Sequence, residues 1–278
     1  MKNLILILAL FSVHFCEAQK QYSKAEMIGY NICFSSLNAG LSRALHKSHK
    51  ESFKDAFFDG LWKGAIGGTI NYASKELVLN LHENNRLNLL WSARLVNSFG
   101  NSITYNAANN HGFLDYLYFD FGFNRLRFDT KHQFKVKYQV MPMAFLTTFL
   151  TLKDGSFDVN KSISTLTPYF IPKENFKGQF SYTRTNHILI HNNQYLAHEM
   201  IHTFQHYEYM IINTYFRKRK PEKQYSELSK LGKINRCIYW DFLNRLVITS
   251  LYLLEGERNS NYYDNFFEFE ANYFSDSL

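Results

Sequence analysis

The spacing of apolar residues divides this 278-residue chain into parts with different local periods. From Ser23 to about Asn110, apolar positions recur every three or four residues, which is typical of helices that bury one face. Three helices are expected here, separated by the polar stretch 46–51 and ending in the turn signal 109–112. The stripes of the first two helices are Ile28, Ile32, Leu37, Leu41 and Leu45, then Phe57, Leu61, Ala65, Ile66, Ile70 and Ala73.

Four glycines lie within the second of these helices, at Gly60, Gly64, Gly67 and Gly68. Small residues at such spacing let a neighbouring helix approach closely, a feature that also occurs in pairs of membrane helices. Lys63 and Asn71 favour a packing face in a water-soluble protein instead. The three helices therefore predict a packing layer or a small N-terminal helical region.

Beyond Gly112 the period shortens, and short segments with alternating polarity predict strands at 116–121, 126–128, 134–140 and 145–152. A loop over 165–177 leads to strands at 180–183 and 186–191, and a helix follows from 195. Helical spacing returns over 233–254, and a final short helix follows the polar turn 259–264. Short connections between strands favour an antiparallel or mixed sheet. The predicted fold class is α+β, with residues 19–111 as a helical region and 112–278 as the second region.

The first 18 residues have the pattern of a secretory signal peptide. Lys2 precedes an apolar run from Leu4 to Phe15, which is too short to span a membrane, and Ala18 suits cleavage. Val13-His14-Phe15 lacks the small residue expected beside a lipidated Cys16. The sequence predicts a secreted, periplasmic or envelope-located protein.

Composition narrows the classes of partner. Aromatic residues make up 17% of the chain, which is far from a disordered composition. The net charge of +7 partly reflects the run Arg217 to Lys220, and no nucleic-acid-binding motif accompanies it. Peripheral association with an anionic envelope or membrane surface stays open. Cys33 and Cys237 of the mature chain either form one disulfide or remain buried thiols.

The strongest chemical signal is the HExxH pattern at His198-Glu199-Met200-Ile201-His202. On a helix, His198 and His202 project from the same face one turn apart, where two imidazoles can bind one zinc ion. Glu199 can then take a proton from water that the ion has acidified. With 11 histidines in the chain, a chance occurrence is expected in about one such chain in fifty.

The strand at 186–191, the turn Asn192-Asn193 and the HExxH helix together resemble the core of the zincin metallopeptidases. With Gln205 after the motif, the segment resembles compact bacterial zincins of the gluzincin type. The resemblance implies a zincin-like half containing the active-site helix, a bound Zn²⁺ and a peptide or protein substrate. The strand beside the helix would lie along the substrate cleft. The extension of the metzincins is absent, because Gln205 and Glu208 occupy its positions.

Two histidines leave a catalytic zinc one protein ligand short. The resemblance implies Glu270, which is followed by Ala271 in a late helix. Glu268 lies about 200° around that helix from Glu270, so both cannot face one metal ion. Other candidates are Glu222, in a basic segment broken by proline, and Glu255 and Glu257, which flank Gly256.

The sequence therefore predicts a zinc metallopeptidase with His198, His202 and Glu270 as metal ligands and Glu199 as general base. The candidates for stabilising an oxyanion are Tyr207, Tyr262, Tyr263 and His206, with His206 favoured as a packing or supporting residue. The alternative is a non-catalytic envelope protein. In it a structural zinc would have a closed ligand shell, and the N-terminal helices would bind a partner or a membrane.

Overall fold

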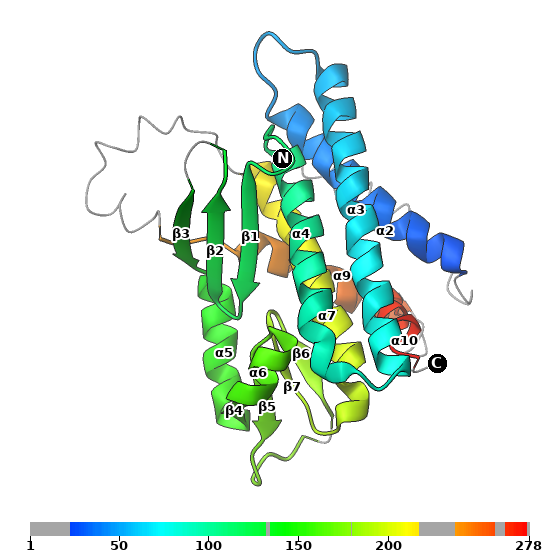
Figure 1. Cartoon of the computed structure of the whole chain (residues 1–278), viewed down its shortest axis with the longest axis vertical. Coiled ribbons are helices and arrows are strands. Elements are labelled where there is room, and N and C mark those ends of the chain that lie inside the picture. The colour runs from blue at the N-terminus through cyan, green and yellow to red at the C-terminus, as the bar shows by residue number, and fades with distance from the viewer. Residues whose placement is uncertain (1–22, 132–133, 179, 217–236, 259–264, 277–278) are drawn as a thin grey trace.

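The computed structural model describes residues 23–131, 134–178, 180–216, 237–258 and 265–276. Helices and two small sheets make up the described chain, so the α+β class predicted from the sequence is confirmed (Figure 1). The signal-peptide segment, the Arg217–Lys220 run, Glu222, Tyr262 and Tyr263 lie outside the described residues. Within them, no helix is both long enough and apolar enough to cross a membrane.

Three long helices form the N-terminal layer, as predicted: α2 (Lys24–Leu45), α3 (Phe53–Glu83) and α4 (Leu90–Ala108). Ser23 and Glu26 form a capping box at the start of α2, and the Ser52 side chain caps α3. The short 3₁₀ segment η1 (Leu87–Leu89) connects α3 to α4.

The glycines of α3 bring its backbone against the neighbouring helices. A Cβ placed on Gly64 would lie only 2.6 Å from the Ala39 Cβ of α2, and one placed on Gly67 would lie 2.8 Å from the Gly100 carbonyl of α4. Side chains larger than hydrogen therefore cannot be accommodated there without moving a helix. The expectation that these glycines permit close helix packing is confirmed.

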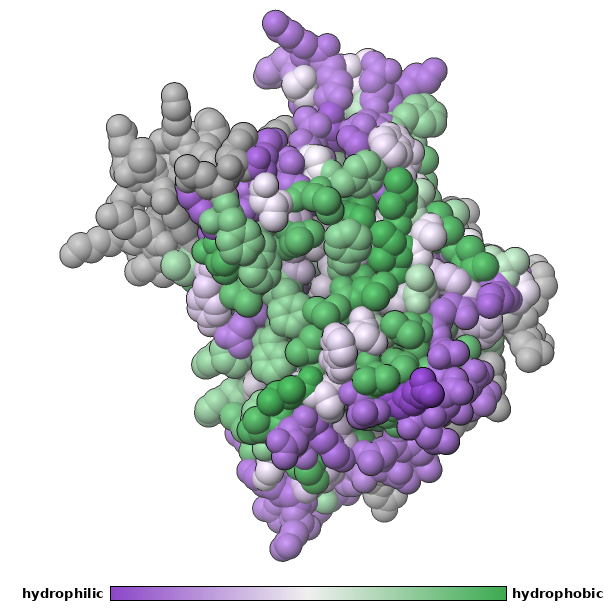
Figure 2. All heavy atoms as spheres, viewed as in Figure 1, coloured by the Kyte–Doolittle hydropathy of each residue, from purple (hydrophilic) through white to green (hydrophobic). Residues whose placement is uncertain are grey.

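The faces that α2 and α3 bury are not the predicted apolar stripes. The buried positions are mostly glycine, alanine, serine and asparagine, whereas Leu37, Leu45 and Ile66 are exposed. Close helix packing selects small residues for the contact and leaves larger ones outside. Figure 2 shows apolar residues gathered on the surface around α3 and α4, where exposed side chains include Phe58, Trp62, Trp91, Leu95 and Phe99.

The two sheets lie beside this helical layer. Strands β1 (Tyr116–Phe121), β2 (Asn124–Asp129) and β3 (Lys135–Val140) form an antiparallel sheet at predicted positions. The second sheet has the order β4-β5-β7-β6 and is mixed, because only β5 and β7 are parallel. Its strands are β4 (Gly155–Asp158), β5 (Tyr169–Pro172), β6 (Tyr182–Arg184) and β7 (His187–Leu189). Strand β6 is thus an edge strand.

The strand predicted at 145–152 is wrong, because this segment belongs to α5 (Pro142–Asp154). Pro142 occupies the first turn, where its missing N–H costs nothing. The Asp241 carboxylate accepts hydrogen bonds from the backbone N–H groups of Met143 and Ala144, both at 2.9 Å. This cap comes from far along the chain. The loop predicted over 165–177 contains β5, and α6 (Val159–Thr165) precedes it.

The remaining described elements are helices that pack against the N-terminal layer. Helix α7 (Leu196–Glu208) follows η2 (Asn193–Tyr195) and continues into η3 (Tyr209–Phe216). Helices α9 (Phe242–Arg258) and α10 (Phe266–Tyr273) complete the described chain. One buried cluster joins residues of the helical layer to α7 and α10, including Met27, Val78, Leu90, Met200, Phe204 and Phe274. The N-terminal helices are therefore a packing layer on the helix that carries the HExxH motif.

Cys33 and Cys237 are both exposed free thiols. Neither of the expectations for them, a disulfide or burial, is met. Cys33 lies on the outer side of α2, and Cys237 lies just before a backbone bridge to Val140. Their positions give these cysteines no role in the core.

The buried His187 on β7 should make the free energy of unfolding depend on pH in the acidic range. Its side chain is buried between hydroxyl groups of α5, with Nε2 2.7 Å from Thr151 Oγ1. Burial, together with Arg245 and Arg184, lowers the pKa of His187 to about 3. Since the folded pKa lies below that of the unfolded chain, neutral His187 contributes stability above about pH 6.5, and this is lost as the pH falls towards 3.

We expect wild type to lose about 2 kcal/mol more unfolding free energy than His187→Gln between pH 7 and 4.5. Urea denaturation of both proteins at the two pH values measures this difference. Other titrating groups are common to both proteins and cancel in the comparison. Equal losses would mean that His187 is not held neutral by the fold.

Candidate metal centre

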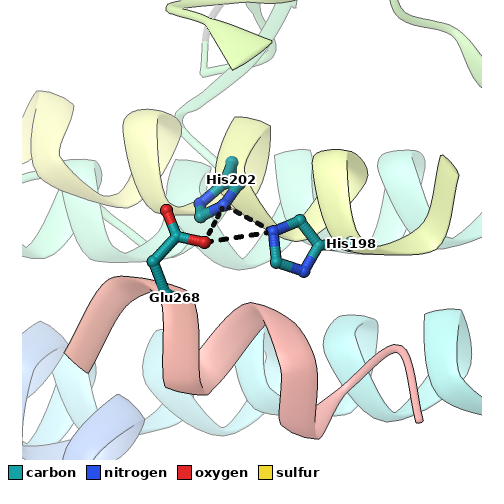
Figure 3. Close-up of side chains that lie close together, drawn as sticks. All are labelled: His198, His202 and Glu268. Atoms are coloured by element: carbon teal, nitrogen blue, oxygen red, sulfur yellow. Dashed lines mark hydrogen bonds and ion pairs between the residues drawn. The ribbon is translucent and has the colours of Figure 1, made fainter. Parts of the chain in front are cut away.

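The HExxH motif lies on α7, and its two histidines face α10. The Nε2 atoms of His198 and His202 are 3.0 Å apart. Glu268 of α10 points between them, with its Oε2 3.3 Å from His198 Nε2 and 3.5 Å from His202 Nε2 (Figure 3). Among the described residues, these three form the one group of histidine, cysteine and carboxylate side chains able to hold a metal ion.

The spacing of these three atoms fits a zinc ion. Tetrahedral zinc binds nitrogen and oxygen at about 2.0–2.2 Å, which places its ligand atoms roughly 3.3–3.5 Å from one another. The three distances between His198, His202 and Glu268 lie between 3.0 and 3.5 Å. Two imidazoles and one carboxylate are also a ligand set found in catalytic zinc sites, with a fourth position left for water.

Gln205 fixes which nitrogen of His202 can bind a metal. The Gln205 amide nitrogen donates to the Phe267 carbonyl and to Glu270 Oε2, both at 2.9 Å. Its oxygen lies 2.9 Å from His202 Nδ1, and can only accept a hydrogen bond there. A flipped amide would place its oxygen against two acceptors. Nδ1 of His202 therefore carries a proton, and Nε2, which faces His198 and Glu268, is the nitrogen that can bind a metal ion after losing its own proton.

The structure places Glu268, and not Glu270, beside the two histidines. Glu270 was predicted to bind the metal and Glu268 to point elsewhere, but Glu268 faces the histidines. Glu270 instead forms an ion pair with Lys75 Nζ at 2.8 Å and accepts a hydrogen bond from Asn31. Both carboxylates are buried, since every residue from Phe266 to Asn272 is buried in α10. Glu268 faces the two histidines, whereas Glu270 faces the ammonium group of Lys75.

The other third-ligand candidates lie outside this group. Glu255 is buried on α9, and neither it nor Glu257 belongs to the group around His198. Glu222 lies outside the described residues. Neither helical periodicity nor the apolar neighbours of α10 distinguish Glu268 from Glu270, because that helix is buried on all sides.

Glu199 lies next to the metal-ligand group and is buried. The hydroxyl oxygen of Thr183 on β6 lies 2.7 Å from Glu199 Oε2 and 2.9 Å from the Glu199 carbonyl oxygen, so its one hydrogen is shared between these two acceptors. Burial raises the pKa of Glu199, although His202 and His198 act in the opposite direction. A carboxylate whose affinity for protons is raised in this way, on the same helix as the metal ligands, has the character of a general base.

The charge pattern around the histidines favours a cation. Burial alone would lower the pKa of His202, but Glu268 and Glu199 outweigh burial and raise the pKa to about 9. Tyr252 of α9 donates a hydrogen bond to Glu268 Oε1 at 2.7 Å, which leaves Oε2 as the oxygen directed at the imidazoles. The surroundings thus stabilise positive charge at the point where the three donor atoms converge.

A cavity of about 260 Å³ opens beside this group. Its walls come from α7, β6 with the residue before it, α9 and α10. The lining residues include Ser181, Thr183, Glu199, His206, Ile248, Tyr252 and Leu253. Glu199 and Glu268 both border the cavity, so a molecule bound there would lie against the metal ligands and the proposed base. The wall formed by α9 is largely apolar.

Of the residues predicted to stabilise an oxyanion, His206 lies in the cavity wall. Burial, followed by Arg245 and His202, lowers the pKa of His206 well below its usual value, so it is neutral there. Tyr207 points away, because its hydroxyl donates to the Asp120 carbonyl and Arg94 lies over its ring at 3.5 Å. Tyr252 borders the cavity but was not a candidate, since it lies in an ordinary helical pattern without a motif.

Comparison with known proteins found no matching family model, no similar curated protein and no similar solved structure.

Proposed function

We propose that this protein is a zinc-dependent hydrolase of the metallopeptidase class, with a zincin-like arrangement of the HExxH helix. The observation that carries the proposal is the convergence of His198 Nε2, His202 Nε2 and Glu268 Oε2 at zinc-ligand spacing beside a cavity that Glu199 lines. The resemblance of the strand–turn–HExxH segment to gluzincins supports the same class.

In this proposal five residues of the chain have separate chemical roles. A zinc ion held by His198, His202 and Glu268 would polarise the substrate carbonyl and acidify a water molecule. Glu199 accepts the proton of that water on its carboxylate and delivers it to the leaving amine. Thr183 orients the Glu199 carboxylate by its hydrogen bond to Oε2.

The proposed substrate is a peptide or protein segment in an extended conformation. Strand β6 is an edge strand, and Ser181, Tyr182 and Thr183 border the cavity. An extended chain could add to this edge through backbone hydrogen bonds, as in strand-addition recognition. The apolar residues Ile248, Leu253 and Phe267 would then receive one side chain of the substrate. The signal-peptide pattern supports an extracytoplasmic location for this reaction.

Removal of the metal tests the proposed function. We expect the mature protein to contain about one equivalent of zinc and to hydrolyse members of a mixed fluorogenic peptide library. Dialysis against a chelator should abolish hydrolysis, and stoichiometric Zn²⁺ should restore it. Elemental analysis and the rate of fluorescence increase measure the two quantities. A protein that binds no zinc, or whose hydrolysis is unaffected by its removal, would refute the proposal.

A further inference from the structure

A chain of polar contacts leads from the N-terminal helical layer to a metal ligand. Lys75 of α3 donates a hydrogen bond to Glu270 Oε1 at 2.8 Å. The second oxygen of Glu270 accepts from the Gln205 amide at 2.9 Å, and the Gln205 oxygen faces His202 Nδ1 at 2.9 Å. Three contacts therefore connect Lys75 of α3 to His202 through Glu270 and Gln205, and each is at hydrogen-bond distance.

Lys75 is fully buried and has three oxygen partners. Besides Glu270, its ammonium contacts Glu208 Oε2 at 2.9 Å and Asn31 Oδ1 at 2.8 Å. Burial alone would lower the pKa of Lys75, but Glu208 and Glu270 outweigh it and raise the pKa. The lysine is therefore charged, with its three N–H donors all directed to acceptors.

Glu270 is held from both sides. Asn31 of α2 and Lys75 of α3 both donate to Oε1, which leaves Oε2 for Gln205 of α7. A carboxylate fixed in this way holds the Gln205 amide in the orientation that presents its oxygen to His202. Carboxylates behind metal-bound histidines commonly fix the imidazole tautomer and increase its basicity.

We propose that Lys75 and Glu270 are positioning residues for the metal ligand His202, acting through Gln205. The inference rests on the proposed function, because it assigns these residues to the same metal centre. It gives the N-terminal helices a role in metal binding that packing alone does not require. It also assigns Glu270 a role in holding Gln205 against His202, although Glu270 lies outside the group formed by His198, His202 and Glu268.

A matched pair of variants separates this role from simple stability. Glu208→Gln and Glu270→Gln each remove one of the two carboxylates that contact Lys75, and each leaves an ion pair with the other. Of the two glutamates, Glu270 is the one that accepts a hydrogen bond from Gln205. We expect Glu270→Gln to weaken zinc binding about tenfold or more, while Glu208→Gln changes it less than about threefold. Competition with a chromophoric chelator measures the zinc dissociation constants.

A third variant tests Lys75 itself. Lys75→Met alone would leave two buried carboxylates without their cation, and such a protein could fail to fold. The double substitution Lys75→Met/Glu208→Gln removes the cation together with one carboxylate and so limits the change in buried charge. We expect this protein to bind zinc at least about tenfold more weakly than Glu208→Gln.

The position of the His202 proton provides a readout that loss of stability would not change. In ¹⁵N-histidine NMR spectra, His202 of the zinc-loaded wild type and of Glu208→Gln should show a protonated Nδ1 shielded from exchange. In Glu270→Gln, that proton should exchange faster. Equal zinc affinities and equal exchange in the two single variants would overturn the inference. A wild type that binds no zinc would instead refute the proposed function itself.

Discussion

Replacing Glu199 by Gln should leave zinc bound at about one equivalent and lower peptide hydrolysis by about three orders of magnitude or more. Glu199 does not belong to the three-residue group that would hold the ion. Its role in the proposal is to accept and return a proton, which an amide cannot do. The Thr183 hydroxyl can still donate to the amide oxygen, so the side chain should keep its position.

Hydrolysis of the peptide library and elemental analysis of the same samples measure the two effects of Glu199→Gln. Glu83→Gln provides a matched control, because Glu83 is exposed at the end of α3 and contacts neither the cavity nor the metal-ligand group. The control should retain wild-type zinc content and activity. Hydrolysis that survives in Glu199→Gln at the wild-type rate would disprove the assignment of the general base.

The same experiment distinguishes the enzyme from a protein with a structural zinc. A structural site has four protein ligands and no place for water or substrate. Among the described residues, three side chains converge here, and they border a cavity of about 260 Å³. This supports the catalytic alternative. If wild type binds zinc tightly but hydrolyses no member of the library, the structural alternative would be favoured.

Much of the fold could be predicted because its signals are local. The periods of α2, α3 and α4 and of strands β1 to β3 depend on residues close in sequence, and these elements occur where they were predicted. Helix α5 could not be predicted in this way. Its first turn is stabilised by Asp241, which is about a hundred positions away. From nearby residues alone, the long apolar segment after Pro142 has the same pattern as a buried strand.

In the candidate site too, contacts within one helix could be predicted from the sequence, but contacts between distant helices could not. His198 and His202 were paired correctly because four-residue spacing on a helix determines which side chains share a face. The third ligand depends on how α10 is rotated against α7. The resemblance to gluzincins selected Glu270 as the third ligand, but the cation beside this carboxylate is the ammonium group of Lys75. Nothing local to residues 266–274 indicates a partner on α3.

The rotation of α10 against α7 predicts effects of different size for its two glutamates. Glu268→Gln should weaken zinc binding by at least about a hundredfold, because the substitution removes the negative charge from the third ligand while keeping its size. Glu270→Gln should have the smaller, roughly tenfold effect of a residue behind the ligands. The order of these effects is the reverse of the order predicted from the sequence.

Competition with a chelator measures both zinc dissociation constants, and Co²⁺ substitution reports the ligand set. The absorption of bound Co²⁺ should change shape in Glu268→Gln, because a neutral amide replaces the carboxylate ligand, and should keep its shape in Glu270→Gln. Thermal unfolding of the zinc-free proteins controls for stability. Both glutamates are buried, so a general loss of stability would affect the two variants alike. If Glu270→Gln weakens zinc binding more than Glu268→Gln and alters the Co²⁺ spectrum, Glu268 is not the third ligand.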